Sequence, residues 1–363
     1  KNYQFWDMAS SAKEKFRETT FFGLSGKEKK TSVAEIKSFL EHGRQKIELG
    51  IENAFDAENK IFPTYFENEI TRFKVNTKRA ASSNSEPVRT LRPLEFKQTP
   101  LPLFLEGPVH AFKVEKDPGR KRELLRAIRN SGLYDSKLNM YKVNASLAGV
   151  SLEIGRACIF ARGWLENESI WLHMEYKLMT EILKSGMTDE FYKDFKNVII
   201  PFQPAERYGR NLLENSSFIV SSVFPDPQLH GAGFVARLSG STAEFLTIWL
   251  VMNIGKKPFI LGPDKKLSLR FEPSLPAFLF TKEDSVRSFF DKDGEETKIK
   301  IPKNSLAFLF LGRTLVFYHN PKKLDTFGKQ RVSVKKIVLQ DSRSKKTEFK
   351  GDTVPSPYAG KVR

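Results

Sequence analysis

Two short segments contain residue types whose spacing could perform chemistry on a bound anion. In the first, Glu166 precedes His173 by about two helical turns, at the start of a strongly apolar run. In the second, Ser239–Thr242 reads Ser-Gly-Ser-Thr, at the expected start of another helix. The first N–H groups of a helix lack internal partners, and the helix dipole favours anions there. A histidine, a carboxylate and a hydroxyl-rich helix start together predict a pocket that holds phosphate beside a polyol.

Each of these features also has a simpler structural explanation. An acid such as Glu166 stabilises the start of a helix by about 0.3–1 kcal/mol. His173 would then be a core histidine that bonds a backbone carbonyl, and Ser241 or Thr242 would be an ordinary N-cap. A cap alone does not require Gly240 beside it, whereas a backbone that closely approaches a bound anion does.

The two segments resemble paired motifs of the inverting disaccharide and oligoglucan phosphorylases related to cellobiose phosphorylase. Residues 166–173, Glu-Asn-Glu-Ser-Ile-Trp-Leu-His, are similar to a Glu-Asn-x-x-Ile-x-x-His stretch of that family. Residues 239–243, Ser-Gly-Ser-Thr-Ala, are similar to its Ser/Thr-Gly-Thr-Ala stretch, with one residue more. The longer run from Trp164 to Gly255 resembles the large bacterial members that act on oligoglucans, with a β-1,2-linked oligoglucan favoured as the substrate.

The resemblance implies phosphorolysis of β-linked gluco-oligosaccharides with inversion, which releases α-glucose 1-phosphate. Inorganic phosphate is the co-substrate, and no metal or other cofactor is expected. His173 would bind the phosphate together with Ser239, Gly240, Ser241 and Thr242. Which of the three hydroxyl groups contacts the phosphate stays open.

Further residues are assigned to the sugar and to acid catalysis by the same resemblance. Glu166, Trp164 and His230 would contact the oligosaccharide. Asp7 follows Trp6 in a stretch similar to the Trp-Asp pattern in which the family places its catalytic acid, and burial against Trp6 would raise the pKa of Asp7. The alternatives are a helix-capping Asp7, a core Trp164 and a loop histidine without a specific role at His230.

The expected chemistry needs only one acid. An inverting hydrolase uses two carboxyl groups, one of which activates water. Phosphate is already an anionic nucleophile, so Asp7 would protonate the glycosidic oxygen while phosphate attacks the anomeric carbon. Two other functions stay open: a non-catalytic carbohydrate-binding or structural fragment of the same fold, and an inverting glycoside hydrolase in which Glu168 or Glu175 activates water.

Hydrophobic periodicity predicts a mainly α-helical chain with a β domain. The pattern contains predicted helices and predicted strands, with a polar surface loop at residues 80–87. The helices are expected at residues 10–22, 32–55, 119–131, 169–184, 188–199 and 242–254. The strands are expected at residues 64–66, 69–75, 109–114, 267–271, 297–301, 305–310, 314–318 and 332–339. The helix at 32–55 begins with a capping box formed by Ser32 and Glu35.

The resemblance implies that these helices form the second half of an (α/α)6 barrel, followed by a small C-terminal β-sandwich. The chain would then be the C-terminal part of a larger polypeptide. Residues 1–255 would belong to the barrel, with an extended insertion at about 60–115. Residues 256–345 would form the β-sandwich and residues 346–363 a tail. Association with the missing N-terminal part, or a homodimer, is expected.

Composition limits the remaining possibilities. The 363 residues carry a formal net charge of +17 but no recognisable nucleic-acid motif, so no nucleic-acid partner is expected. Apolar runs are shorter than the roughly 18 residues of a membrane span, so no membrane partner is expected either. The single cysteine, Cys158, excludes an internal disulfide and favours a cytoplasmic location.

Overall fold

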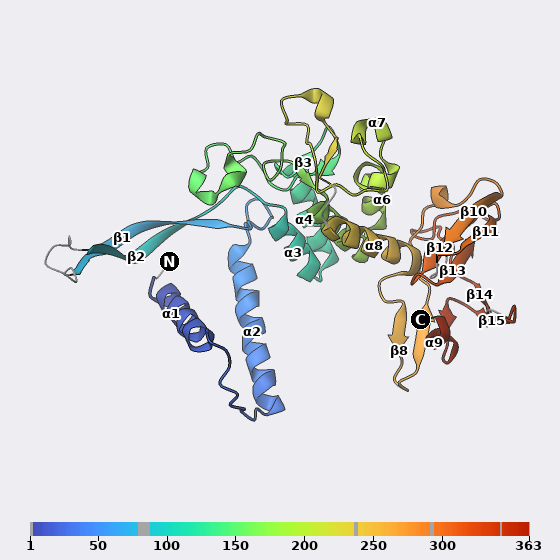
Figure 1. The fold of residues 1–363 in the computed structure, drawn as a ribbon, viewed down its shortest axis with the longest axis horizontal. Coiled ribbons are helices and arrows are strands. Elements are labelled where there is room, and N and C mark those ends of the chain that lie inside the picture. Colours follow the sequence, from blue (N-terminus) through green and yellow to red (C-terminus); the bar gives the residue numbers. More distant parts are fainter. Residues whose placement is uncertain (1–2, 79–87, 236–238, 291–293, 342, 363) are drawn as a thin grey trace. The chain divides into compact units, whose positions relative to one another are not determined.

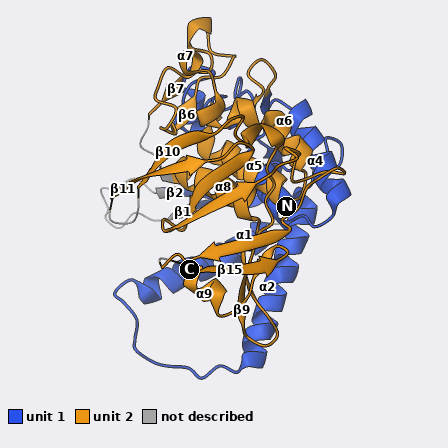
Figure 2. Cartoon of the chain, turned by 90° about the vertical axis from the view of Figure 1, so that its right-hand side faces the viewer, with its two compact units in different colours: residues 1–134, 142–169 blue, residues 135–141, 170–363 orange. Residues whose placement is uncertain are grey.

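The structure is a computed structural model that describes residues 3–78, 88–235, 239–290, 294–341 and 343–362. The chain divides into two compact units, coloured separately in Figure 2. The first comprises residues 1–134 and 142–169, and the second comprises residues 135–141 and 170–363. The loop predicted at residues 80–87 lies outside the described residues.

The first unit begins with two helices that bury little of their surface, α1 (Tyr3–Thr20) and α2 (Val33–Ala54) (Figure 1). The predicted capping box of α2 is confirmed. Ser32 Oγ accepts a hydrogen bond from the N–H of Glu35 at 3.2 Å, and Glu35 Oε2 accepts one from the N–H of Ser32 at 2.7 Å. α1 buries Tyr3, whereas no residue of α2 is fully buried. The apolar stripe of α2 is therefore largely exposed.

A long antiparallel hairpin follows α2. Its strands are β1 (Phe66–Lys78) and β2 (Val88–Pro100), and β1 contains the strand predicted at residues 69–75. β2 includes Pro93 and ends at Pro100. A two-stranded sheet leaves one edge of each strand without a ladder partner, so residues that lack an N–H are tolerated there.

The apolar core of the first unit is built around α3 (Glu106–Val114) and α4 (Pro118–Asn130). Asp117 caps α4, because its Oδ1 accepts a hydrogen bond from the N–H of Arg120 at 2.7 Å. The buried side chains of this core come from both helices and their flanks: Leu105, Val109, Phe112, Leu124, Leu125, Ile128 and Leu133.

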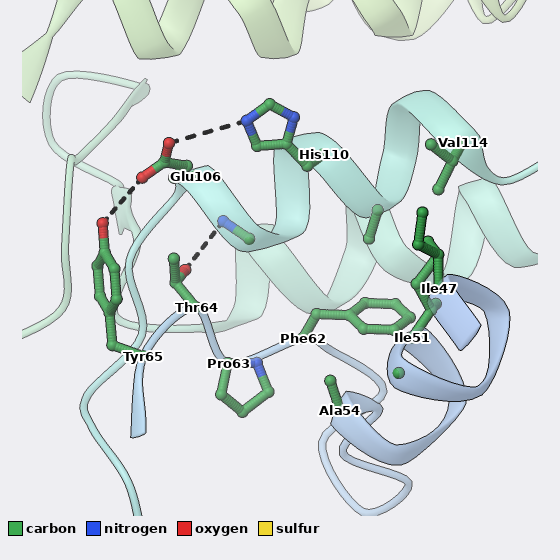
Figure 3. Close-up of a pocket in the computed structure, with 13 residues that line it drawn as sticks. Ile47, Ile51, Ala54, Phe62, Pro63, Thr64, Tyr65, Glu106, His110 and Val114 are labelled. Carbon is green, nitrogen blue, oxygen red and sulfur yellow. Dashed lines mark hydrogen bonds and ion pairs between the residues drawn. The ribbon is translucent and has the colours of Figure 1, made fainter. Parts of the chain in front are cut away.

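The strand predicted at residues 109–114 is wrong, because these residues belong to helix α3. Pro108 lies in the first turn of α3, where a missing N–H breaks no helical hydrogen bond. Thr64 anchors the start of the helix: its Oγ1 accepts a hydrogen bond from the N–H of Gly107 at 2.9 Å and donates one to the carbonyl of Phe104 at 2.8 Å (Figure 3).

The second unit contains α5 (Leu172–Lys184), α6 (Thr188–Val198) and α8 (Ser239–Ile254). α5 packs against both α6 and α8. α5 begins three residues later than the predicted start at residue 169, because Ile170 and Trp171 form strand β5 instead.

A small antiparallel sheet joins the residue pair before α5 to two strands that lie between α7 and α8 in the chain. Its order is β5 (Ile170–Trp171), β6 (Phe218–Ile219) and β7 (Gly233–Phe234). β5 leads directly into α5, and β7 precedes α8. The ladder therefore sets where the first turns of the two helices lie.

The C-terminal part of the second unit consists of small antiparallel sheets. One sheet has three strands, in the order β16 (Thr353–Val354), β9 (Leu267–Arg270) and β8 (Phe259–Leu261). The others are hairpins with these strands: β10 (Ser285–Phe290), β11 (Glu296–Ile301), β12 (Ser305–Phe310), β13 (Thr314–His319), β14 (Lys336–Gln340) and β15 (Lys346–Lys350). The strands predicted at 297–301, 305–310 and 314–318 are confirmed.

The remaining elements are short. They comprise two-residue strands, single helical turns and 3-10 turns: β3 (Tyr134–Asp135), β4 (Met140–Tyr141), α7 (Ala205–Tyr208), α9 (Tyr358–Val362), η1 (Leu152–Ile154), η2 (Arg156–Cys158), η3 (Ile200–Phe202), η4 (Pro227–Leu229) and η5 (Ala277–Leu279). None of the described helices is both long enough and apolar enough to cross a membrane.

The predicted half of an (α/α)6 barrel is not found. The structure is 37% helical and 24% strand, with many small antiparallel sheets. A barrel of helical hairpins requires successive long helices that bury one face against their neighbours. In the described chain α2 has no buried residue, α3 and α6 are short, and hairpins separate the helices. The C-terminal strands likewise form separate small sheets.

Candidate functional site

The two segments that the sequence singled out meet in the second unit. His173 lies in the first turn of α5 and Gly240 in the first turn of α8. A Cβ atom built on Gly240 would lie 2.9 Å from Nδ1 of His173 and 3.0 Å from its Cε1. Real Cβ atoms essentially never come this close to another atom without a shift. The imidazole therefore packs directly against the backbone of Gly240, and any other residue there would displace it.

The hydroxyl residues around Gly240 differ in their surroundings. Ser239 is the first residue of α8, and Ser241 is fully buried. Thr242 is exposed, and its Oγ1 accepts a hydrogen bond from Nδ2 of Asn215 at 3.5 Å. The first turn of α8 contains no acidic residue, and Glu244 follows in the second turn. Of Ser241 and Thr242, only Thr242 is exposed to a ligand in solution.

The charge at His173 is set by burial and by two neighbours. Burial lowers the pKa of the half-buried His173 imidazole, the Lys177 ammonium lowers it further, and the Glu244 carboxylate opposes them. The net direction is downward from 6.5, so the ring is neutral at pH 7. Lys177 lies one helical turn after His173 on α5, and it was missed by the sequence analysis. The four-residue spacing was the signal that could have found it.

The predicted catalytic acid, Asp7, lies on α1 of the first unit. It is half-buried, and its Oδ1 accepts a hydrogen bond from the Tyr3 hydroxyl at 3.2 Å. Trp6 stays 55% exposed and packs on Tyr3 and Phe96, with ring centroids 5.5 Å and 6.2 Å away. The aromatic contacts of Trp6 are thus with other rings of the first unit.

Glu166 and Trp164, the predicted sugar contacts, lie in the first unit in a loop before β5. Glu166 does not lie at the mouth of a helix, as expected; it pairs with Arg156 at 2.7 Å. Its other carboxylate oxygen, Oε2, is buried without a hydrogen-bond partner among the described residues. Trp164 is half-buried and forms an isolated β-bridge with Asn167.

His230, the third predicted sugar contact, follows η4 in the second unit. Its Nε2 lies 2.8 Å from the carbonyl oxygen of Phe224, and its own N–H donates to the carbonyl of Pro227 at 3.3 Å. One ring nitrogen is therefore engaged within the loop, and Nδ1 is the nitrogen left for a ligand.

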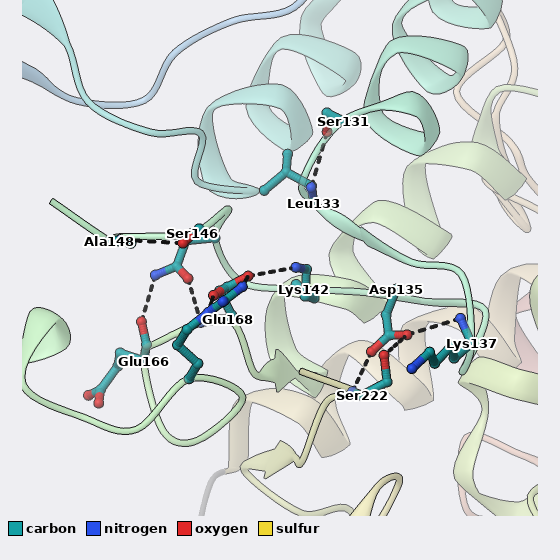
Figure 4. A network of polar contacts seen from close by, with 12 residues as sticks. Ser131, Leu133, Asp135, Lys137, Lys142, Ser146, Ala148, Glu166, Glu168 and Ser222 are labelled. Carbon is teal, nitrogen blue, oxygen red and sulfur yellow. Dashed lines mark hydrogen bonds and ion pairs between the residues drawn. The ribbon is translucent and has the colours of Figure 1, made fainter. Parts of the chain in front are cut away.

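A second polar centre surrounds Glu168 in the first unit (Figure 4). Glu168 is 1% exposed, and its carboxylate accepts hydrogen bonds from Lys142 Nζ at 2.9 Å and from the Arg162 guanidinium. Asn144 connects it to the preceding loop, accepting from the N–H of Glu168 and donating to the carbonyl of Glu166, each at 2.6 Å. Burial raises the pKa of Glu168, but the two cations outweigh burial and hold it below 4.5.

A third polar centre lies in the second unit around Glu175, which is fully buried on α5. Its Oε1 accepts a hydrogen bond from the N–H of Tyr141 at 2.8 Å, and its Oε2 has no partner among the described residues. Burial raises the pKa of Glu175 well above 4.5, and the like charges of Asp194 and Asp135 raise it further. Neutral donors hold the two aspartates: the Tyr141 hydroxyl donates to Asp194 at 2.6 Å, and Ser222 donates to Asp135 through both its N–H and its hydroxyl (Figure 4).

No cluster of three or more His, Cys, Asp or Glu side chains suited to a metal ion occurs among the residues that the structure describes. The groups that could hold an inorganic anion are instead His173, Lys177 and the first turn of α8. No known protein-family model matches this chain, and no curated protein sequence does.

Proposed function

We propose that the protein is a glycoside phosphorylase that cleaves β-linked gluco-oligosaccharides with inversion and releases α-glucose 1-phosphate. The observation that carries the proposal is the contact between His173 and Gly240. It puts an imidazole at the N-terminal end of a sixteen-residue helix whose first turn has hydroxyl groups and no acid.

The phosphate subsite follows from the chemistry of these groups. The N–H groups of the first turn of α8 have no helical acceptor, and the helix dipole adds a partial positive charge of about one half. A neutral His173 donates one hydrogen bond, the Lys177 ammonium adds a full charge, and Thr242 adds a hydroxyl. Together they favour a phosphate dianion by charge-assisted hydrogen bonds.

The reaction itself needs one proton donor. In the proposal a carboxylic acid protonates the glycosidic oxygen as that bond breaks, while a phosphate oxygen forms the new bond to the anomeric carbon from the opposite face. The sugar leaves as an alcohol, and glucose 1-phosphate carries the inverted configuration. The role of the acid is assigned to Asp7, and Glu166 is assigned to accept hydrogen bonds from hydroxyl groups of the leaving sugar. These two roles come from the family resemblance.

Hydrolysis is a weaker proposal. It requires a carboxylate that reaches a water molecule, and Glu168 and Glu175 were the candidates. Glu168 is 1% exposed and held in two ion pairs, and Glu175 is 0% exposed. A phosphate nucleophile needs neither residue.

Phosphate dependence tests the proposal directly. The full chain is incubated with β-1,2-, β-1,3- and β-1,4-linked gluco-oligosaccharides, with and without inorganic phosphate, and α-glucose 1-phosphate is measured. We expect this product only when phosphate is present. Free glucose at the same rate without phosphate would indicate hydrolysis, and oligosaccharide binding without any product would indicate a carbohydrate-binding protein.

Two substitutions test the phosphate subsite. Gly240→Ala displaces the ring of His173, and His173→Ala removes it; each should weaken phosphate binding by roughly tenfold or more, since a hydrogen bond to a charged group contributes about 1.5–3 kcal/mol. Binding is measured by calorimetry with inorganic phosphate. The control is His42→Ala, at an exposed position on α2. Unchanged phosphate affinity in both variants would refute the subsite.

A further inference from the structure

A cavity of about 570 Å³ opens in the first unit, and none of the residues assigned to phosphate or sugar lines it. It lies between the C-terminal half of α2, the segment Phe62–Tyr65 and α3 (Figure 3). One wall is apolar and one end is polar. The apolar wall consists of Ile47, Ile51, Ala54, Phe62 and Val114. The volume is in the usual range for small-molecule sites, about 300–1,000 Å³.

The polar end is organised by Glu106. Its Oε2 accepts a hydrogen bond from the Tyr65 hydroxyl at 2.9 Å, and its Oε1 lies 3.8 Å from Nε2 of His110 (Figure 3). Burial and the hydrogen bond to Glu106 raise the pKa of Tyr65, so the phenol keeps its proton and donates it. The Glu106 side chain is 43% exposed, and Glu106 is one of the residues that line the cavity.

The cavity has a charge opposite to that of the whole chain. Glu106 is the one acid among the lining residues that the structure describes, and those residues include no lysine or arginine. The chain as a whole carries a net charge of +17. A general electrostatic attraction would therefore favour anionic ligands, so a preference for a cation has to come from the cavity itself.

We propose that this cavity binds an organic amine with an aromatic or long alkyl body. The ammonium group donates to the carboxylate of Glu106, and the body of the ligand packs against the apolar wall. A charge-assisted hydrogen bond is about twice as strong as a neutral one, and the buried body adds hydrophobic stabilisation. A carboxylate with the same body is repelled by Glu106.

Two fluorescent probes with opposite ends test the charge preference. Dansylcadaverine carries a naphthalene body and a terminal ammonium, and dansyl-ε-aminocaproate has the same body, a chain of similar length and a terminal carboxylate. Each is titrated into the full chain while the blue shift and intensity of the dansyl emission are followed. We expect saturable binding of the amine, with the acid weaker by about tenfold or more.

Two glycines of α2 provide a matched pair of variants. Gly50 lines the cavity, and Gly43 lies two turns earlier on the same helix face and does not. A Cβ atom added at either position meets no atom within 4 Å, and leucine favours a helix more than glycine does. Gly50→Leu should therefore fold and lose amine binding, whereas Gly43→Leu should bind like the original chain. Circular dichroism checks the helix content of both.

A third variant tests the charge. Glu106→Gln keeps the shape of the side chain and removes its charge, so the amine should lose about tenfold in affinity and the two probes should bind alike. Several results would overturn the proposal: no saturable amine binding to the original chain, equal affinity for the two probes there, or unchanged binding in Gly50→Leu. None of these results depends on whether the protein binds phosphate.

Discussion

Glu168 and Glu175 lie within one short stretch of sequence and are both buried, yet their surroundings are opposite. Glu168, in the first unit, is held by two cations that keep its pKa below 4.5. Glu175, in the second unit, has one backbone donor and two like charges nearby, and its pKa lies well above 4.5. Burial acts in the same direction on both residues. The presence or absence of a counter-charge therefore decides whether the pKa of a buried carboxylate is lowered or raised.

The two sites should respond to pH in opposite directions. Glu168 has a depressed pKa, so its stabilisation is present above pH 4.5 and is lost as the pH falls through its folded-state pKa. Glu175 has a raised pKa, so the folded state holds its proton more tightly than the unfolded state does. Its effect on stability is most favourable below pH 4.5 and declines as the pH rises toward its folded-state pKa.

The largest effect is expected from Lys142→Met, which removes the buried cation from Glu168. The side chain of Lys142 is 7% exposed, so Glu168 would lose its best-buried counter-charge. We expect a loss of about 3 kcal/mol in the free energy of unfolding, measured by urea denaturation at pH 7. Lys336→Met, at an exposed ion pair, is the control and should change stability by less than about 0.5 kcal/mol. Equal losses in the two variants would mean that the buried ion pair contributes no more to stability than the exposed one.

Tyr141→Phe should have the next largest effect. It removes the hydroxyl that donates to the buried Asp194 at 2.6 Å, and a hydrogen bond to a charged group contributes about 1.5–3 kcal/mol. Tyr65→Phe is a matched control, because its hydroxyl donates to a carboxylate that is partly exposed. At pH 7, Tyr141→Phe should lower the free energy of unfolding by more than Tyr65→Phe does. A larger loss in Tyr65→Phe would show that the Tyr141 hydroxyl contributes little to the stability of the buried carboxylates around Glu175.

At pH 5 Glu175→Gln should produce a smaller effect than the first two substitutions, and the effect should grow with pH. Near pH 5 the variant and the original chain should unfold with similar free energies, since Glu175 is protonated in the folded state. As the pH rises from 5 to 8, the variant should become more stable relative to the original chain. The gain is about 1.4 kcal/mol for each pH unit that lies between the unfolded-state and the folded-state pKa of Glu175. Parallel stability curves across this range would show that the pKa of Glu175 is not raised.

The smallest effect is expected from Arg162→Gln. The Arg162 side chain is 54% exposed, so water and salt screen its attraction to Glu168. A loss of about 0.5 kcal/mol is expected at low salt, and it should shrink further in 1 M sodium chloride. A loss as large as that of Lys142→Met would mean that both cations hold Glu168 equally.

Several elements could be predicted from the sequence because their causes are local. The capping box of Ser32 and Glu35 requires only residues three apart, and it is confirmed. The strands at 305–310 and 314–318 follow from alternation and an intervening turn, and both are confirmed. The strand predicted at 109–114 is wrong, because alternating apolar residues over one short segment fit a helix as well.

The candidate site was only partly predictable. The sequence named His173 and Gly240, and the structure places them in contact. Lys177 was missed, although its four-residue spacing from His173 on the predicted helix could have found it. The cavity beside Glu106 required knowing that α2 and α3 lie next to one another, which no local pattern indicates.

The sequence by itself indicated that helices lie near α1, α2, α4, α5, α6 and α8 and that strands lie at β11, β12 and β13, since caps, turns and periodicity act over a few residues. It did not determine the architecture: the expected half barrel depended on how helices pack, and the apolar stripe of α2 stays largely exposed. Only the tertiary structure decided that Glu168 meets Lys142 and Arg162 while Glu175 meets Asp194. A charge acts through space on whatever packing brings near it, and packing joins residues that are far apart in the chain.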